Sequence, residues 1–283
     1  MLRGGRRKNM SELLSRRVVG ILLMLISHSA AAESFSVGIV PQHSPKKLAE
    51  AWQPLLSYIG SETGHTFHFE TAKDIPTFEK ALSEGKYDIA YMNPYHFVVF
   101  HKNPGYRALV RQKDQTIQGI IVVPRDSPLS ELSDLEGNKI AFPAPAAFAA
   151  SIIPRATMQK EGINFTPVYV HSHDSVYLNV KRGFFKAGGG IYRSLQATDD
   201  DVKENLKVLW SSPAYTPHAI ATHPRLSEEV RGQLLNVLTT MTPGGKGSDA
   251  LNSLKMKGFS EAFSADWDDI RALNIDLLQQ ENP

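Results

Sequence analysis

The chain has 283 residues, 42% hydrophobic and 21% charged, which is enough for one or two α/β domains with a substantial core. Its 31 Lys and Arg residues nearly balance its 29 Asp and Glu residues. It contains no cysteine, which excludes a disulfide framework and any site built on a thiol.

The first 32 residues are predicted to be a secretory signal peptide. Six of the basic residues lie there, followed by an apolar run over Val18–Ile26 and by Ala30–Ala32 as a small-residue cleavage site. Without this segment the chain keeps 25 basic and 28 acidic residues, a formal charge of −3. That balance gives no electrostatic footprint for nucleic acid, and we expect a periplasmic protein.

The first strand is predicted over Phe35–Val40, where apolar residues at alternate positions, Phe35, Val37 and Ile39, share one face. Ser44 is then a good N-cap, and Pro45 fits the first position of a helix. Apolar residues at helical spacing follow and should face the sheet: Leu48, Trp52, Leu55, Leu56 and Ile59.

The same strand-to-helix chemistry recurs at residues 86–100. Tyr87–Tyr91 is predicted to be a buried strand, Asn93 an N-cap and Pro94 the first helical residue. The backbone N–H groups at the start of such a helix have no acceptor within the helix and carry partial positive charge, so they can bind an anion.

Two further junctions follow in the second half of the chain. Residues 143–151 lead from a strand at 139–142 into a helix, and 172–175 follow a strand at 168–171. A long β-branched run at 117–123 could carry the chain into a second lobe. The three glycines at 188–190 are predicted to form a tight turn rather than a phosphate-binding loop.

Strands that alternate with helices predict parallel or mixed sheets, with helices on both faces. Four similar junctions, at 42–44, 91–96, 145–149 and 172–175, predict several helix N-termini that converge on one cleft.

These motifs together resemble the periplasmic phosphate/phosphite/phosphonate-binding proteins of ABC transporters, in the type II periplasmic binding-protein class. The likeness rests on the first strand with its Pro-Gln-His loop, on Asp88–Pro94, on Asp134–Gly137, on Ser172–Asp174, and on Gly183 with Ala187–Gly188. The resemblance implies two α/β lobes joined by two crossing strands that act as a hinge. We expect lobe 1 at 33–117 and 214–283, and lobe 2 at 118–213.

The resemblance also implies a function. We expect a solute-binding protein, a monomer and not an enzyme, that captures a small anion in the cleft for an ABC permease. Matching the family's residues to this chain puts an aromatic ligand contact at Tyr91 and a ligand histidine at His173. The family's Ser-Thr-Ser run falls on Ala147–Ala149, and its carboxylate falls on Lys186, so the ligand site is divergent.

We therefore expect an anionic group held by backbone N–H groups, Lys186 and His173, and an apolar part against Phe148, Tyr91 or Tyr95. The complete set of candidate ligand-binding residues is Gln42, His43, Tyr91, Asn93, Tyr95, His96, Ala147, Phe148, Ala149, Ser151, His173 and Lys186.

Alternatives remain on the residues alone. His43, His96 and His173 could make a receptor for a metal or metal chelate, although no carboxylate lies at fixed spacing with them. The same fold could report to a membrane sensor kinase instead of a permease. No cofactor motif is present: Gly244–Ser248 lacks the Ser or Thr that a phosphate loop needs after its Lys.

Overall fold

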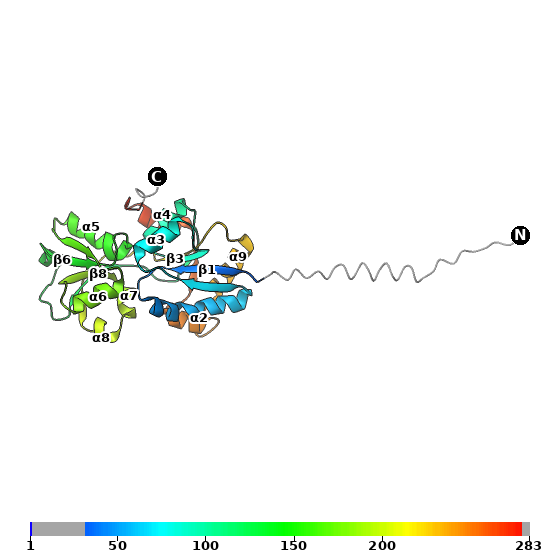
Figure 1. The fold of residues 1–283 in the computed structure, drawn as a ribbon, viewed down its shortest axis with the longest axis horizontal. Coiled ribbons are helices and arrows are strands. Elements are labelled where there is room, and N and C mark those ends of the chain that lie inside the picture. The colour runs from blue at the N-terminus through cyan, green and yellow to red at the C-terminus, as the bar shows by residue number, and fades with distance from the viewer. Residues whose placement is uncertain (2–31, 279–283) are drawn as a thin grey trace. The chain divides into compact units, whose positions relative to one another are not determined.

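The computed structural model describes Met1 and residues 32–278, so the predicted signal peptide lies almost wholly outside the described residues. Residues 34–278 contain two sheets (Figure 1). No helix among the described residues has both the length and the apolar character needed to cross a bilayer.

The first sheet has the strand order β11-β4-β10-β3-β1-β2. Its strands are β1 (Ser34–Ile39), β2 (Thr66–Glu70), β3 (Ile89–Met92), β4 (Arg107–Gln112), β10 (Ala219–Thr222) and β11 (Phe259–Glu261). β1 pairs in parallel with both β2 and β3, whereas β10 runs antiparallel to β3 and β4. The sheet is therefore mixed, as predicted.

The second sheet has the order β7-β6-β8-β5-β9. Its strands are β5 (Gly119–Pro124), β6 (Lys139–Phe142), β7 (Thr166–Tyr169), β8 (Ala187–Ile191) and β9 (Leu206–Ser211). β6 pairs in parallel with β7 and β8, and β5 pairs antiparallel with β8 and β9.

Helices cover both faces of each sheet. Figure 1 shows α2 (Pro45–Thr63) on one side of the first sheet and α3 (Ile75–Ser83) and α4 (Pro94–Lys102) on the other. The second sheet lies between α5 (Ile153–Lys160) on one side and α6 (His173–Lys181) and α8 (Asp200–Lys203) on the other. The other helical segments are η1 (Leu132–Leu135), η2 (Phe148–Ile152), α7 (Tyr192–Ala197), α9 (Glu228–Thr240), α10 (Ser248–Leu254), η3 (Ser264–Trp267) and α11 (Asp268–Arg271).

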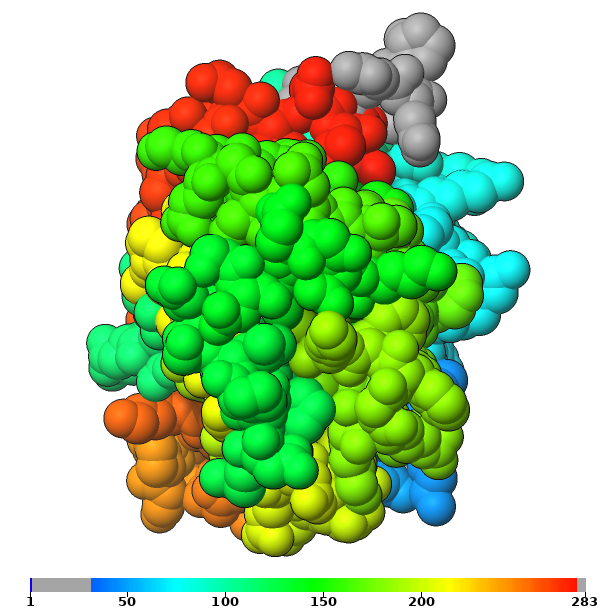
Figure 2. All heavy atoms as spheres, turned by 90° about the vertical axis from the view of Figure 1, so that its left-hand side faces the viewer, coloured from blue at the N-terminus to red at the C-terminus, as the bar shows by residue number. Residues whose placement is uncertain are grey.

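The chain passes between the sheets twice, at 113–118 and 212–218. Ile117 and Tyr215 form an antiparallel bridge there, and each backbone N–H donates to the other residue's carbonyl oxygen at 2.9 Å. We propose these crossings as the boundaries of lobe 1 and lobe 2. Figure 2 shows the molecule from the end of lobe 2, whose green and yellow-green segments face the viewer.

The turn prediction for residues 188–190 is wrong: these glycines form the middle of the buried strand β8. They are needed because η2 and α6 approach the strand closely. A Cβ on Gly189 would lie 2.0 Å from the carbonyl oxygen of Ala150, and one on Gly190 would lie 2.3 Å from the Tyr177 hydroxyl. The strand therefore lacks side chains because helices lie directly on its backbone.

Candidate ligand-binding site

Four helical segments begin at the interface between the two lobes, as predicted. The side chains that cap α2, α4 and α6 are those of Ser44, Asn93 and Ser172. The fourth segment, η2, begins after Ala147 without a side-chain cap. Two of these segments come from each lobe, because each follows the carboxyl end of a strand that faces the other lobe.

A small cavity lies where these segments meet. Its polar lining comes from Gln42, Asn93, His173 and His218, and its remaining lining from Val40, Ile75, Ile117, Ala147, Phe148, Ala149, Ala150 and Ile191. The cavity measures about 10 Å³, which is room for about one water molecule. The lobes therefore lie against each other at the predicted cleft.

Direct hydrogen bonds join the lobes around this cavity. The backbone N–H of His173 donates to the carbonyl oxygen of Gln42 at 3.1 Å. The amide nitrogen of Asn93 donates to the carbonyl oxygen of Ala146 at 3.2 Å, while its oxygen accepts the α4 capping bond. The predicted site residues Gln42, Asn93 and His173 thus hold the closed arrangement.

His43 takes part in an ion pair between the lobes instead of lining the cavity. Its Nδ1 lies 2.7 Å from Asp174 Oδ1, and the backbone N–H of Ser44 donates to the other oxygen of Asp174 at 3.3 Å. Burial alone would raise the pKa of Asp174, but the hydrogen bond from His43 and the charges of His43 and Lys47 outweigh it. The pKa of this carboxyl therefore lies below its usual value.

The two cavity histidines are held neutral by burial. Desolvation, with a smaller contribution from the charge of His43, lowers the pKa of His173 to about 3, and its Nδ1 lies 2.9 Å from Ser194 Oγ. Desolvation and the nearby Arg193 also hold the pKa of His218 well below its ordinary value. The cavity can therefore offer hydrogen bonds to an anion, but not imidazolium charge.

His218 was not predicted as a site residue, although it ends the segment that returns to lobe 1. The Gln42 amide nitrogen lies 3.1 Å from its Nε2, and its ring stacks on Tyr91 with 4.9 Å between centroids. Only the pairing of β10 with β3 brings it beside Tyr91. No local pattern in the sequence marks this contact.

Tyr95, His96 and Ser151 are among the predicted site residues that do not line the cavity. Tyr95 is buried, and its hydroxyl accepts from the backbone N–H of Leu278 at 2.9 Å. His96 is fully buried behind Asn93, with Nε2 2.9 Å from Glu79 Oε1. Ser151 is buried in η2, and its hydroxyl has no hydrogen-bond partner among residues 32–278.

Lys186 does not line the cavity either, although it was predicted to contact the ligand. β8 runs parallel to β6, and Ala187 pairs with Ile140 near the start of that strand. The cavity residues 147–150, by contrast, follow the end of β6. Lys186 is therefore exposed at the end of lobe 2 that faces away from the cavity.

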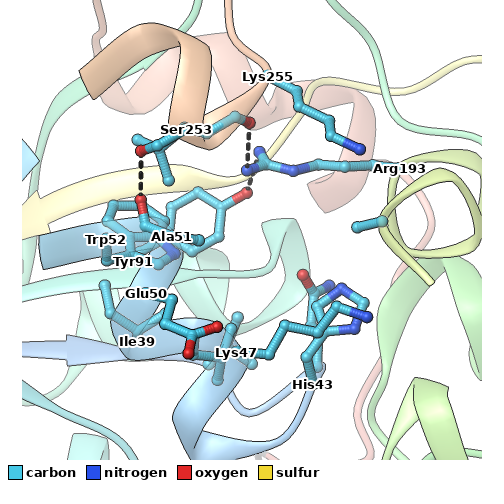
Figure 3. Close-up of a pocket in the computed structure, with 15 residues that line it drawn as sticks. Ile39, His43, Lys47, Glu50, Ala51, Trp52, Tyr91, Arg193, Ser253 and Lys255 are labelled. Carbon is cyan, nitrogen blue, oxygen red and sulfur yellow. Dashed lines mark hydrogen bonds between the residues drawn. The ribbon is translucent and has the colours of Figure 1, made fainter. Parts of the chain in front are cut away.

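Beside the cavity lies a larger pocket that also has walls from both lobes (Figure 3). Its volume is about 350 Å³. Tyr91 contributes its ring, 4.6 Å from Trp52 between centroids, and its hydroxyl accepts from Arg193 Nη1 at 2.8 Å. Arg193 follows β8 at the start of α7, and the sequence analysis missed it.

The histidines do not form a metal centre in the described part of the chain. Between residues 32 and 278, no three His, Cys, Asp or Glu side chains are grouped as ligands for one ion. His43, His96 and His173 instead have separate partners, namely Asp174, Glu79 and Ser194. This arrangement gives the metal-receptor alternative no geometric support.

Comparisons with known proteins agree with this geometry. Residues 37–267 match the family described as "ABC transporter, phosphonate, periplasmic substrate-binding protein". The phosphate-import protein PhnD of Mycolicibacterium smegmatis is 23% identical over 278 residues, which covers 86% of this chain and 80% of that protein. The tetrathionate sensor histidine kinase TtrS of Salmonella typhimurium is 23% identical over 148 residues, covering 49% of this chain and 25% of the kinase.

Solved structures share the fold at low sequence identity. PhnD1 of Prochlorococcus marinus, in complex with methylphosphonate, has a TM-score of 0.78 at 16% identity, covering 85% of this chain and 98% of that one. A binding protein of an ABC phosphonate transporter from Pseudomonas aeruginosa also has a TM-score of 0.78 at 16% identity, with 86% of each chain covered. The chain therefore has the two-lobed type II fold and belongs to the periplasmic substrate-binding proteins of the phosphonate ABC-transporter family.

Proposed function

We propose that this protein captures a small anionic solute between its lobes and presents it to an ABC permease. The observation that carries the proposal is the convergence of four helical segments, two from each lobe, on one cavity. Each exposed helix N-terminus stabilises an anion by roughly 0.3–1 kcal/mol, and more where water is excluded. We infer that the solute enters when the lobes separate and that closure then surrounds it. The capture requires no catalysis, and we expect a monomer.

We further propose that a simple phosphonate is a poor ligand. The loop at 147–149 has the sequence Ala-Phe-Ala, which offers backbone N–H groups but no hydroxyls. Each lost hydrogen bond to a charged oxygen costs roughly 1.5–3 kcal/mol of binding free energy. The neutral His173 and His218 do not replace that lost charge stabilisation.

The proposed ligand contacts follow from the cavity and its neighbours. Gln42, Asn93 and His173 would donate to the anion once the lobes part, with the backbone N–H groups of 147–149. Tyr91 would contact it from the adjoining pocket. The proposal assigns no ligand contact to Tyr95, His96, Ser151 or Lys186, because they lie outside both linings.

A second candidate function is to signal ligand binding to a membrane sensor kinase. The match to the tetrathionate sensor kinase, across about half of this chain, favours it. The capture step would be the same, but closure of the lobes would be read by a kinase rather than a permease. Genes for a permease and ATPase beside this one would favour import, and a kinase gene would favour sensing.

The experiment that tests capture is native mass spectrometry of untagged protein purified from the periplasm. We expect a bound anion of low mass, released when the protein unfolds. The same preparation tests two further proposals: export should leave a chain that begins near Glu33, and the native mass should be that of a monomer. A co-purified neutral solute, or protein that is stabilised by no anion in a thermal-shift panel, would contradict the proposed function.

A further inference from the structure

Arg193 carries a charge that no acidic side chain neutralises in the described part of the chain. Nη1 donates to the Tyr91 hydroxyl at 2.8 Å and to Gln112 Oε1 at 3.4 Å, and Nη2 donates to the carbonyl oxygen of Leu254 at 3.4 Å. All three acceptors are neutral. Among residues 32–278, none of the ion pairs that the structure shows includes Arg193.

These contacts orient the guanidinium without compensating its charge. They reach from α7 in lobe 2 to β3, β4 and α10 in lobe 1, so that Arg193 spans the interface. The Arg193 guanidinium carbon also lies 5.6 Å from the centre of the Tyr91 ring. A guanidinium fixed in this way is suited to a carboxylate, phosphonate or sulfonate, since its N–H groups match two oxygens of one anionic group.

Pockets open on both sides of the Arg193–Tyr91 pair. One measures about 350 Å³ and the other about 310 Å³, and both are lined by Tyr91, Arg193 and Lys255. In the first pocket Lys47, which also pairs with Asp199 at 3.1 Å, adds a further cation, and Glu50 is the one carboxylate among the described residues of the lining. Figure 3 shows Lys255 and Lys47 on either side of the space that Arg193 enters.

The first pocket also has an apolar wall. Trp52 and Tyr91 form an aromatic wall, and Ile39, Val40 and Leu48 extend it. Ligand sites for organic molecules have volumes of roughly 300–1,000 Å³ and combine apolar walls with a few polar groups. A tetrahedral oxyanion would contact the cations, but it would have no apolar part to place against this wall.

We propose that this pocket binds an organic anion, with its phosphonate, sulfonate or carboxylate group on Arg193 and an aromatic or branched aliphatic body against Trp52 and Tyr91. This inference rests on the proposed function, since it specifies the class of anion that the lobes capture. It also accounts for a site without hydroxyls at 147–149, because Arg193 adds charge-assisted hydrogen bonds to the anionic group that the loop does not supply. The apolar body then provides the affinity that the missing hydroxyls do not.

Isothermal titration with phenylphosphonate and methylphosphonate tests this assignment. These probes share one anionic group and differ in the body. Burial of a phenyl ring against the aromatic wall should make phenylphosphonate bind at least about tenfold more tightly. Arg193→Gln should weaken phenylphosphonate binding by about 10- to 150-fold, and Arg193→Lys should weaken it less because the charge remains.

A matched control is Arg125→Gln. Arg125 lies in the same lobe, donates to the carbonyl oxygens of Glu204 and Leu206, and lines neither pocket. This variant should bind phenylphosphonate as the wild type does. Thermal melting of each variant separates loss of binding from loss of folding. Trp52 fluorescence gives a second readout, because a phenyl group beside the indole should change its emission.

The outcomes separate the two proposals. Methylphosphonate and phenylphosphonate binding with equal affinity, or Arg193→Gln binding phenylphosphonate like the wild type, would overturn the pocket assignment and leave anion capture standing. Wild-type protein that binds neither phosphonate, and is stabilised only by neutral solutes, would overturn both. Selective binding of phenylphosphonate that depends on Arg193 would support both.

Discussion

The backbone N–H of His173 in lobe 2 donates to the carbonyl oxygen of Gln42 in lobe 1, over 3.1 Å. Both residues lie at helix N-termini where a ligand is expected, so the lobes here bond to each other directly. Beside them, His43 and Asp174 form an ion pair between the lobes. Separation of the lobes must break these contacts.

Asp174→Asn is expected to destabilise the closed arrangement at neutral pH. The pKa of Asp174 is depressed, so the stabilisation that its charge provides is complete above about pH 4 and is lost as the pH falls further. The variant should unfold several degrees below the wild type at pH 7 and pH 5. The difference should shrink as the pH falls below about 4, as thermal melting monitored by circular dichroism will show.

A matched control is Asp199→Asn, which removes the other ion pair between the lobes. Lys47 and Asp199 lie 3.1 Å apart, but the Asp199 side chain is 81% exposed. Exposed pairs contribute about 0–1 kcal/mol, so the melting temperature should change little. A large effect at Asp199, or none at Asp174, would show that burial does not determine the strength of these pairs.

The strand-to-helix junctions could be predicted because their signals are local. Asn93 and Pro94 are adjacent in the sequence and give α4 its cap and its first residue, and Ser44 with Pro45 does the same for α2. Family resemblance then placed the junctions in two facing lobes, and the fold confirms this.

Arg193, His218 and the glycines of β8 could not be predicted in the same way. Arg193 reaches Tyr91 across 102 positions of sequence, and His218 depends on the register of β10 against β3. Lys186 was expected at the site from a motif match, which does not show at which end of its strand the residue lies. The parallel pairing of β8 with β6 sends its first residue away from the interface. These positions depend on pairing between residues far apart in the chain, which no short stretch of sequence indicates.

The lowered pKa of His173 in the cavity should make the free energy of unfolding fall in mild acid. His173 stays neutral in the folded protein, with its pKa lowered to about 3, whereas an unfolded histidine titrates near 6.5. As the pH falls below about 6.5, the unfolded state binds a proton that the folded state does not. Stability should therefore fall by up to about 1.4 kcal/mol per pH unit from this group.

His173→Asn tests that origin, since an amide can still bond to Ser194 but does not titrate. The variant should lose about 2 kcal/mol less than the wild type between pH 7 and pH 5, measured by urea unfolding at each pH. An exposed histidine changed in the same way, His68→Asn, should leave the pH dependence as it is. Identical slopes in wild type and His173→Asn would show that another group is responsible.

The location of the predicted site residues gives a third test. Lys186→Ala and Tyr95→Phe should leave the affinity for the co-purified solute within about twofold, because neither residue lines the cavity or the adjoining pocket. His173→Ala and Tyr91→Phe should weaken it by tenfold or more through lost hydrogen bonds. Calorimetry on the four variants distinguishes the groups, and a strong effect of Lys186→Ala would return that residue to the site.

Gly189→Ala should both destabilise the fold and displace the loop that closes the cavity. The added Cβ would lie 2.0 Å from the carbonyl oxygen of Ala150 and 2.5 Å from Phe142. Neither neighbour can yield cheaply, since one is backbone and the other is a fully buried ring, so the cost should be at least about 2 kcal/mol. For a domain of this size, the melting temperature should fall by about 4–8 °C.

Gly232→Ala is the matched control, because Gly232 lies inside α9 and, beyond the adjacent backbone of that helix, no described atom lies within 4 Å of the added Cβ. It should raise stability by about 0.5–1 kcal/mol through better helix propensity. Because Ala150 and Phe148 belong to η2, Gly189→Ala should also weaken solute binding, whereas Gly232→Ala should not. If Gly189→Ala melts like the wild type and binds solute normally, η2 does not depend on its contact with β8.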